Sequence, residues 1–406
     1  MRLDRNLVKQ NKVLILLLSL IVISVTAFSC VFPSSGGGCA GSGPQGGSGF
    51  TGYNGVIYFG SMDGRVLALN PSSRSQGLTF PSKEEWSYVI KTPAAPGSMC
   101  GLACTPASPV ASIYSTPAAV GGLIYIGAYS GKVYALNAAT GALRWVYPRE
   151  GYETIGAIVG NLVVADDTVC ITSSNGKIYA LDASTGDLKW DFPGKGETIA
   201  IGKIWTSPAV SSGVVYVGSY DGNVYALSSQ DGSQLWKFKS PAAIASSPVA
   251  SEDSVFFGTF DRHLYAIDKV DGQEKWKFQG GNWFWASPLV KDNVVYAGCL
   301  DHKIYALEAK TGNKLWEFDT DSRIISAPVF AGNFLVAVSE LGKLYILGAD
   351  SGKEERPAVP IGYSVMASLY AEGNVVYVHA RNHCVYSVNI QSGEISWKFC
   401  YSDTTK

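Results

Sequence analysis

The sequence predicts an all-β fold, an eight-bladed β-propeller of four-stranded antiparallel blades. Three observations carry this prediction. A unit of about 40 residues recurs after residue 50, each copy holds apolar runs joined by glycine turns, and a tryptophan recurs at one place in most copies. A four-stranded unit of this length, repeated radially, is typical of a propeller. Closure into a ring also removes the exposed edges that an open stack of strands would leave.

The composition agrees with this fold and excludes one class of function. The 406 residues include 45 glycines and 22 tyrosines, and only 16% are charged, which favours many short strands joined by tight turns. The 32 basic and 33 acidic residues nearly balance. Nucleic-acid-binding proteins usually carry a basic excess, so we expect no nucleic-acid partner.

Residues 1–29 are predicted to be an export signal. A basic stretch over residues 2–12 precedes an uncharged apolar run over residues 13–28, which is short for a membrane span of about 20 residues. The run ends in Ala27-Phe28-Ser29-Cys30, which resembles a bacterial lipobox. We expect lipidation at Cys30; an uncleaved anchor or ordinary cleavage is the alternative.

A flexible tether is predicted over residues 30–49, because its Gly/Ser-rich sequence cannot form a core. The propeller is assigned to residues 50–406. Every version of the signal places this body outside the cytoplasm. We therefore expect an extracytoplasmic monomer held at a membrane, in the periplasm or at the cell surface, by its N-terminal anchor.

Each repeat divides into four strands. Ser-Pro pairs such as Ser207-Pro208 open the innermost strand, and runs such as Val255-Phe256-Phe257 form the second. Turn dipeptides such as Asp221-Gly222, which tolerate positive φ, join it to the third strand, where the Tyr-Ala-Leu motif recurs. A second glycine turn leads to the outermost strand, which carries the tryptophan. The first unit lacks a Ser-Pro pair, so we expect Gly49–Tyr53 to supply its first strand.

The recurring tryptophans are expected to be structural. They are Trp86, Trp145, Trp190, Trp236, Trp276, Trp316 and Trp397, and the seventh unit carries Arg356 at this position. A buried indole removes a large apolar area from water. Truncating one to alanine is expected to cost about 3–5 kcal/mol.

Two stretches carry a family resemblance. Residues 135–145 (ALNAATGALRW) and 180–190 (ALDASTGDLKW) resemble the tryptophan-docking repeat of quinoprotein-type, PQQ-like repeat β-propellers. The resemblance extends over nearly all of residues 50–400. It implies that each tryptophan packs against the glycine turn of the neighbouring blade. WD40 propellers are the competing family, but Trp-Asp occurs here only at Trp190-Asp191.

The resembling family contains quinone-dependent dehydrogenases and also cofactor-free lipoproteins of outer-membrane β-barrel assembly. Resemblance to the enzymes implies PQQ and Ca²⁺ held by acidic and amide side chains, but the acids of this chain do not match that site. Asp166-Asp167 predicts a solvated turn, and His379 and His383 flank a hairpin turn, so their spacing does not indicate a metal site. We expect no cofactor and no metal. A PQQ-dependent oxidoreductase, or its electron-transfer accessory, is the alternative.

The eight cysteines do not define one pairing. Cys100 and Cys104 could bridge a small loop within the insertion over residues 98–113, which is itself a candidate contact loop. Cys384 and Cys400 flank the last hairpin and could pair, although their expected register places them on opposite faces. The others, including Cys170 and Cys299, have no evident partner.

A candidate binding surface lies in the segments that enter the innermost strands. Its residues are Trp205, Trp283, Phe284, Trp285, Lys203, Arg323 and Tyr363. In a propeller these segments meet at one end of the central channel. Aromatic rings with nearby cations would bind a protein, a glycan or a cofactor-like ring; alternatively, they plug the channel. The leading prediction is a non-enzymatic, membrane-tethered scaffold that binds a protein or ligand, and a ligand sensor is a further alternative.

Overall fold

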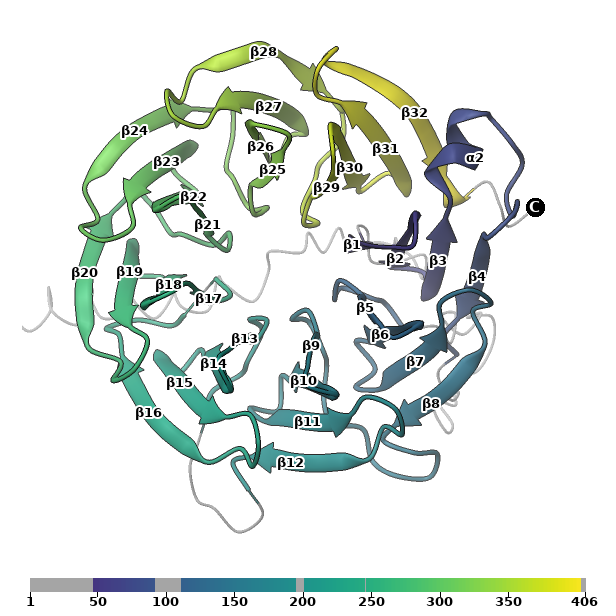
Figure 1. The fold of residues 1–406 in the computed structure, drawn as a ribbon, viewed down its shortest axis with the longest axis horizontal. Helices are drawn as coiled ribbons and strands as arrows, with labels where there is room; N and C mark the ends of the chain where they lie inside the picture. The colour runs from purple at the N-terminus through teal and green to yellow at the C-terminus, as the bar shows by residue number, and fades with distance from the viewer. Residues whose placement is uncertain (1–46, 92–110, 195–200, 245, 403–406) are drawn as a thin grey trace, which may run out of the picture. The chain divides into compact units, whose positions relative to one another are not determined.

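The computed structural model describes residues 47–91, 111–194, 201–244 and 246–402. Within these residues the strands form eight antiparallel four-stranded sheets around a common centre (Figure 1). The predicted eight-bladed propeller is therefore confirmed. The export signal, Cys30, most of the tether and the Cys100–Cys104 pair lie outside the described residues.

In every blade the four strands follow chain order from the centre outward (Figure 1). Blade 1 contains β1 (Gly47–Tyr53), β2 (Val56–Ser61), β3 (Arg65–Leu69) and β4 (Trp86–Val89), with the helix α2 (Pro71–Ser75) inserted before β4. Blade 2 contains β5 (Ala118–Val120), β6 (Leu123–Gly127), β7 (Val133–Asn137) and β8 (Leu143–Tyr147). Blade 3 contains β9 (Val163–Ala165), β10 (Thr168–Thr172), β11 (Ile178–Asp182) and β12 (Leu188–Phe192). Blade 4 contains β13 (Ala209–Ser211), β14 (Val214–Gly218), β15 (Asn223–Ser228) and β16 (Gln234–Lys239).

The second half of the chain repeats this order. Blade 5 contains β17 (Val249–Ala250), β18 (Ser254–Gly258), β19 (His263–Asp268) and β20 (Glu274–Gln279). Blade 6 contains β21 (Leu289–Lys291), β22 (Val294–Gly298), β23 (Lys303–Glu308) and β24 (Lys314–Asp319). Blade 7 contains β25 (Val329–Ala331), β26 (Phe334–Val338), β27 (Lys343–Gly348) and β28 (Glu354–Pro360). Blade 8 contains β29 (Tyr370–Glu372), β30 (Val375–Ala380), β31 (Cys384–Asn389) and β32 (Glu394–Cys400).

The expected first strand of blade 1 is present. β1 pairs with β2, as predicted for Gly49–Tyr53, and it starts at Gly47, inside the stretch that the sequence assigns to the tether. Blade 1 is therefore complete without a strand from the C-terminal end of the chain.

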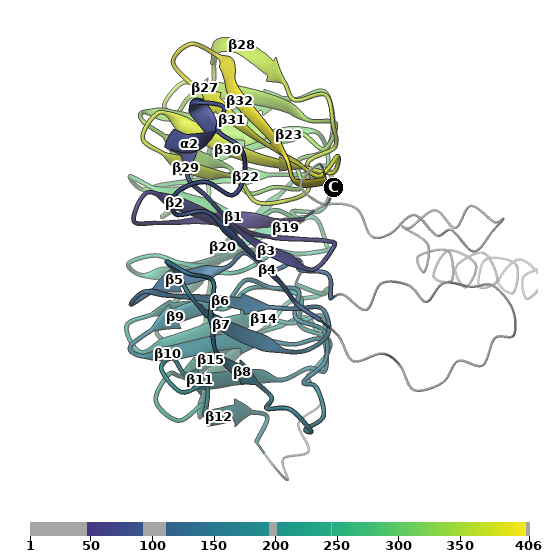
Figure 2. The same ribbon diagram turned by 90° about the vertical axis from the view of Figure 1, so that its right-hand side faces the viewer.

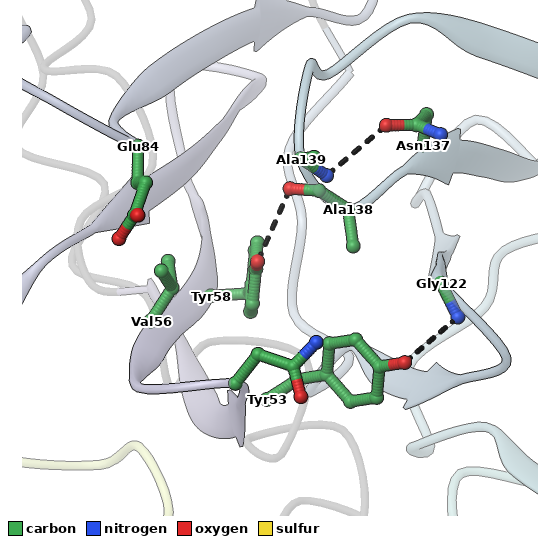
Figure 3. Close-up of a pocket in the computed structure, with 9 residues that line it drawn as sticks. Tyr53, Val56, Tyr58, Glu84, Gly122, Asn137, Ala138 and Ala139 are labelled. Carbon is green, nitrogen blue, oxygen red and sulfur yellow. Dashed lines mark hydrogen bonds between the residues drawn. The ribbon is translucent and has the colours of Figure 1, made fainter.

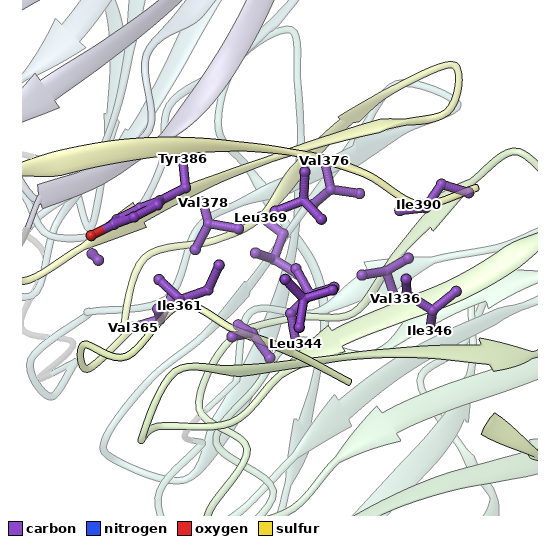
Figure 4. Packing of buried hydrophobic residues seen from close by; sticks show 14 of the residues in the cluster. Val336, Leu344, Ile346, Ile361, Val365, Leu369, Val376, Val378, Tyr386 and Ile390 are labelled. Atoms are coloured by element: carbon purple, nitrogen blue, oxygen red, sulfur yellow. The ribbon is translucent and has the colours of Figure 1, made fainter. Parts of the chain in front are cut away.

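The hydrophobic core lies between the blades. Eight buried clusters each combine side chains of two neighbouring blades. Figure 4 shows the cluster between blades 7 and 8, where Val336 and Leu344 meet Val376 and Val378. Both faces of the middle strands are covered, which explains why these strands read as unbroken apolar runs rather than as alternating ones.

Six tryptophans pack against the second glycine turn of the following blade. Trp145 donates its indole N–H to the carbonyl of Ala183 at 3.0 Å, and its ring lies against Gly186. Gly186 has a φ of +74°, and a Cβ placed on it would come within 2.6 Å of the indole ring. The same ring-on-glycine contact is made by Trp86, Trp190, Trp236, Trp276 and Trp316.

Two junctions depart from this contact. In blade 7, Arg356 replaces the indole, and its Nε donates to the carbonyl of Gln391 at 3.1 Å. The corresponding turn glycine, Gly393, then has no ring against it, since a Cβ there would lie 3.9 Å from the Cβ of Arg356. In blade 8, Trp397 packs on Tyr377 with ring centroids 5.9 Å apart. Trp397 has no glycine turn to pack on, because blade 1 carries α2 and its flanking loops in place of the second glycine turn.

A polar cluster joins blades 8 and 1. The Nδ1–H of buried His379 donates to the carbonyl of Ser48 at 2.9 Å, so its Nε2 accepts the hydroxyl proton of Tyr401, 3.0 Å away. The pKa of His379 is lowered to about 4, mainly by desolvation and also by the neighbouring His383. The hydrogen bond to Ser48 acts in the opposite direction. Arg65 donates to the carbonyl of Tyr401 at 2.9 Å and lies over its ring.

The expected register of Cys384 and Cys400 was wrong. The two residues are directly opposite each other and form a disulfide. A bulge between Ser387 and Val388 shifts the pairing of β31 and β32 by one residue, which moves the side chain to the other face. Cys170 and Cys299 are buried free thiols, and desolvation raises the pKa of each to about 12.

The tryptophan contact predicts unequal costs for two glycine substitutions. Gly186→Ala places a methyl group against Trp145, whereas Gly122→Ala has a similar φ of +78° with no atom within 4 Å. The free energy of unfolding should fall by about 1–3 kcal/mol more for Gly186→Ala than for Gly122→Ala. Chemical denaturation measures the difference, and equal losses would show that the contact adds nothing beyond backbone strain.

The buried His379 predicts a loss of stability in acid. Its pKa is about 4 when folded, against 6.5 for an exposed histidine, so the unfolded chain binds the proton first. The free energy of unfolding should therefore fall between pH 6.5 and 4, by up to about 3 kcal/mol from this residue. Denaturation curves across this range should show a shallower pH slope for His379→Gln; an unchanged slope would contradict the assignment.

A candidate binding face

One face of the propeller gathers two kinds of segment, seen edge-on in Figure 2. These are the connections between blades and the turns that join the second and third strands of each blade; we call this side the connection face. In blades 2–8 the turn is hydrogen-bonded to the connection that enters the blade. The N–H groups of Tyr220 and Leu300 donate to the carbonyls of Lys203 and Trp283, each at 3.0 Å. The backbone thus fixes the side chains on this face.

Five aromatic residues form a continuous strip across blades 4, 5 and 6. The aromatic strip consists of Trp205, Tyr220, Phe260, Trp283 and Trp285. The ring centroids of Trp205 and Tyr220 are 5.1 Å apart, and those of Tyr220 and Phe260 are 5.6 Å apart, both edge to face. Phe260 then contacts Trp283 at 4.7 Å and Trp285 at 5.7 Å. Aromatic pairs of this geometry stabilise one another beyond the area that they bury.

The strip keeps part of its area accessible to solvent. Trp205 is 40% exposed, and the other four rings are partly exposed. The ring of Tyr220 is held between those of Trp205 and Phe260, and burial raises the pKa of its hydroxyl to about 12. The strip therefore presents a rigid apolar surface. Such rings lose little conformational entropy when a partner covers them.

The structure brings together only some of the predicted surface residues. Trp205, Trp283 and Trp285 meet through Tyr220 and Phe260. Lys203 is exposed beside the strip. Farther along the chain, the half-exposed Arg323 pairs with Glu340 at 2.8 Å in blade 7, and the ring of Tyr363 lies 6.0 Å from the Lys398 ammonium in blade 8.

Phe284 was wrongly included in the predicted surface. It is fully buried and packs against Phe278 and Tyr305. Side chains alternate in the extended Trp283-Phe284-Trp285 segment, so the middle ring points into the blade. The corresponding residues of neighbouring connections, Ile204 and Ile324, are also fully buried.

The sequence analysis missed two members of the strip. Tyr220 and Phe260 each stand directly before the aspartate of a turn, Asp221 and Asp261. Aligning the repeats on this turn would have placed both aromatic residues on the connection face. A second pair there, Tyr114 with the half-exposed Tyr129, has ring centroids 5.3 Å apart.

A groove lies at the opposite ends of the strands, between blades 1 and 2. The groove has a volume of about 320 Å³. Figure 3 shows Tyr53, Tyr58 and Glu84 on its wall. Tyr58 donates to the carbonyl of Ala138 at 3.1 Å, and desolvation, with Tyr53 and Glu84 nearby, raises its pKa to about 12.

A second groove, of about 350 Å³, occupies the equivalent place between blades 2 and 3. It is lined by Tyr125, Asp166 and Asp167 among others, and both aspartates adopt the positive φ of a turn, as expected. Because the groove recurs at successive junctions, it follows from the repeat rather than from a specialised site.

The alternative that uses PQQ would need a Ca²⁺ held by acidic and amide side chains. Across the four described ranges, no three His, Cys, Asp or Glu side chains are grouped so that they could hold a metal ion. We derive no reaction step through that cofactor. The same ranges contain no helix long and apolar enough to cross a membrane.

Comparison with known proteins agrees with the repeat. The sequence profile described as outer membrane protein assembly factor BamB matches residues 48–204 and 178–399. The crystal structure of BamB from Moraxella catarrhalis aligns with a TM-score of 0.62 and 19% identity, over 82% of this chain and 91% of that one. The computationally designed protein Ika8 aligns with a TM-score of 0.66 and 19% identity, over 84% and 95%.

No curated protein matches the sequence. The two structural likenesses show the fold, whereas the profile match covers most of the propeller. On that match, and on the tryptophan-docking repeat that runs from blade to blade, the chain belongs to the BamB family of PQQ-like repeat β-propellers.

Proposed function

We propose that this chain is a non-enzymatic, extracytoplasmic scaffold, tethered to a membrane, that binds a protein partner on its aromatic strip. The observation that carries the proposal is the strip itself, five contiguous and partly exposed rings on one face of a rigid propeller. Membership of a family named for an assembly factor supports a role in binding proteins.

The composition of the strip suits a protein interface. Tryptophan and tyrosine are enriched among the residues that contribute most to binding energy, and connected aromatic patches on monomers are often functional. Lys203 beside the strip adds a positive charge at its rim, where charge guides association. Rings already packed on one another need no rearrangement when the partner docks.

The place where the tether joins the propeller supports the membrane arrangement. Gly47, at the start of β1, pairs with Ser61 beside the first turn of blade 1, so the chain enters the propeller at the connection face. The sequence predicts a tether over residues 30–49, and a flexible Gly/Ser chain as long as the part that precedes Gly47 would span about 20–25 Å on average. The start of β1 and the aromatic strip therefore lie on the same face of the propeller.

The Cys384–Cys400 disulfide supports export. Disulfides persist in oxidising compartments and are rare where thiols are kept reduced. Together with the basic and apolar N-terminal segment, it favours a location outside the cytoplasm.

A photo-crosslinker on the strip should capture the partner. Benzoylphenylalanine at Trp205 should give a specific crosslinked species in intact membranes, whereas the same group at Leu315, 54% exposed on the outermost strand β24, should not. Adding Trp283→Ala and Trp285→Ala to the Trp205 probe should abolish the species, because the apolar contact area is lost.

Thermal unfolding controls for folding. The Trp283→Ala/Trp285→Ala variant should stay folded at the assay temperature, since partly exposed rings contribute less than the docked tryptophans. Equal crosslinking from Trp205 and Leu315, or crosslinking that survives the double substitution in folded protein, would refute the strip as the interface.

The anchor has its own test. Mass spectrometry of the mature protein should find Cys30 as the first residue, carrying a diacylglyceryl group. A Cys30→Ala variant cannot carry the lipid. It should then leave the membrane fraction, because stable anchoring depends on the buried acyl chains. An intact N-terminus in the wild-type protein would indicate an uncleaved anchor instead.

A further inference from the structure

The junction between blades 8 and 1 lacks the connection that links every other pair of neighbouring blades. The outermost strand of each of blades 1–7 leads along the chain into the next blade, whereas β32 is the last strand. No strand of the described ranges is exchanged between the two ends, because all four strands of blade 1 and all four of blade 8 are contiguous in sequence. This junction depends on side chains.

Side chains at and just after the end of β32 join the core of this junction and add specific contacts to blade 1. Tyr401, fully buried, holds His379 through its hydroxyl and Arg65 through its carbonyl. Phe399 packs on Phe80 with ring centroids 5.3 Å apart, and the guanidinium of Arg74 in α2 lies 5.3 Å from the ring of Phe399. The insertion that contains α2, in place of the second turn of blade 1, thus packs against the last strand of blade 8.

The disulfide lies between these two contacts. Cys400 stands between Phe399 and Tyr401, and its bond to Cys384 ties the end of β32 to β31. The equivalent cross-strand pairs elsewhere are not cysteines; in blades 4, 5 and 6 they are Asn223 with Lys239, His263 with Gln279, and Lys303 with Asp319. Among the described blades, a covalent bond therefore occurs in the blade whose outermost strand does not lead into a neighbouring blade.

We infer that the Cys384–Cys400 disulfide is a redox-dependent latch for ring closure. When it is oxidised, it holds Phe399 and Tyr401 in the junction with blade 1. When it is reduced, the end of β32 loses its cross-link to β31 and frays, and the contacts of Ser48 and Arg65 with blade 8 are lost with it. The ring is then open at one junction while the other seven remain docked.

Closing the latch requires an oxidant of the thiol–disulfide class. One cysteine thiolate attacks a disulfide of the oxidant, which forms a mixed disulfide and releases one thiolate. The second cysteine then attacks the mixed disulfide and releases the other thiolate. Two electrons pass to the oxidant, and the two cysteines lose two protons in total. The oxidant is a separate molecule, so the state of the latch follows the redox environment in which the chain resides.

Hydrogen–deuterium exchange of the full chain, with and without dithiothreitol, tests the latch. Reduction should raise the exchange of β32 and also of β1, which lies in the other blade, by on the order of 100-fold, as expected for removing a cross-link of this loop length. The strands β14 and β15 of blade 4 serve as the internal reference and should not change. The Cys384→Ala/Cys400→Ala variant should show the reduced pattern without reductant and no further response to it.

Two outcomes overturn the inference. If reduction releases β32 while β1 keeps its protection, the disulfide is a local staple of blade 8 and not a latch for the ring. If the double variant still responds to reductant, another cysteine carries the effect. The Cys170→Ala/Cys299→Ala variant is the matched control and should respond as wild type does. Should the double variant fail to fold, stepwise reduction of the wild-type protein gives the same comparison of β1 with blade 4.

Discussion

The packing of an indole on the glycine of the next blade is the contact on which the architecture depends. It repeats at six junctions and couples two requirements in one place: the turn needs a positive φ, and the ring needs a surface with no Cβ. The indole N–H also satisfies a carbonyl of the same turn, as Trp145 does with Ala183. Since each blade buries its faces only against its neighbours, this contact sets the spacing at which all the interblade cores form.

Much of the fold could be predicted because each blade of a propeller corresponds to one copy of a sequence repeat of about 40 residues. The Tyr-Ala-Leu strand, the glycine turns and the tryptophans each recur at fixed spacing, so errors in one unit are corrected by the next. The predictions that failed concern features that do not recur with the repeat. The bulge between Ser387 and Val388 adds one residue on one strand only, and this reversed the expected faces of Cys384 and Cys400. A bulge is a backbone feature with no required side chain.

The binding face was predicted less well, for a related reason. The sequence located the connections that carry Trp205 and Trp285, but a surface depends on which side chains of different segments meet in space. Tyr220 and Phe260 come from turns, 15 and 25 residues away from those tryptophans in the sequence. Phe284 was misplaced because a run of three aromatics hides the alternation of an extended segment. Assigning inward and outward positions required the register, which only the assembled blade supplies.

The entry of the chain at β1 has a mechanical consequence. β1 pairs only with β2 within its sheet, and its first residue, Gly47, is the point where any force from the preceding residues reaches the propeller. Force applied at that residue bears first on the backbone pairing between β1 and β2. The innermost strand of blade 1, together with its contacts to blade 8 through Ser48 and Phe50, would therefore bear tension before the outer strands of that blade do.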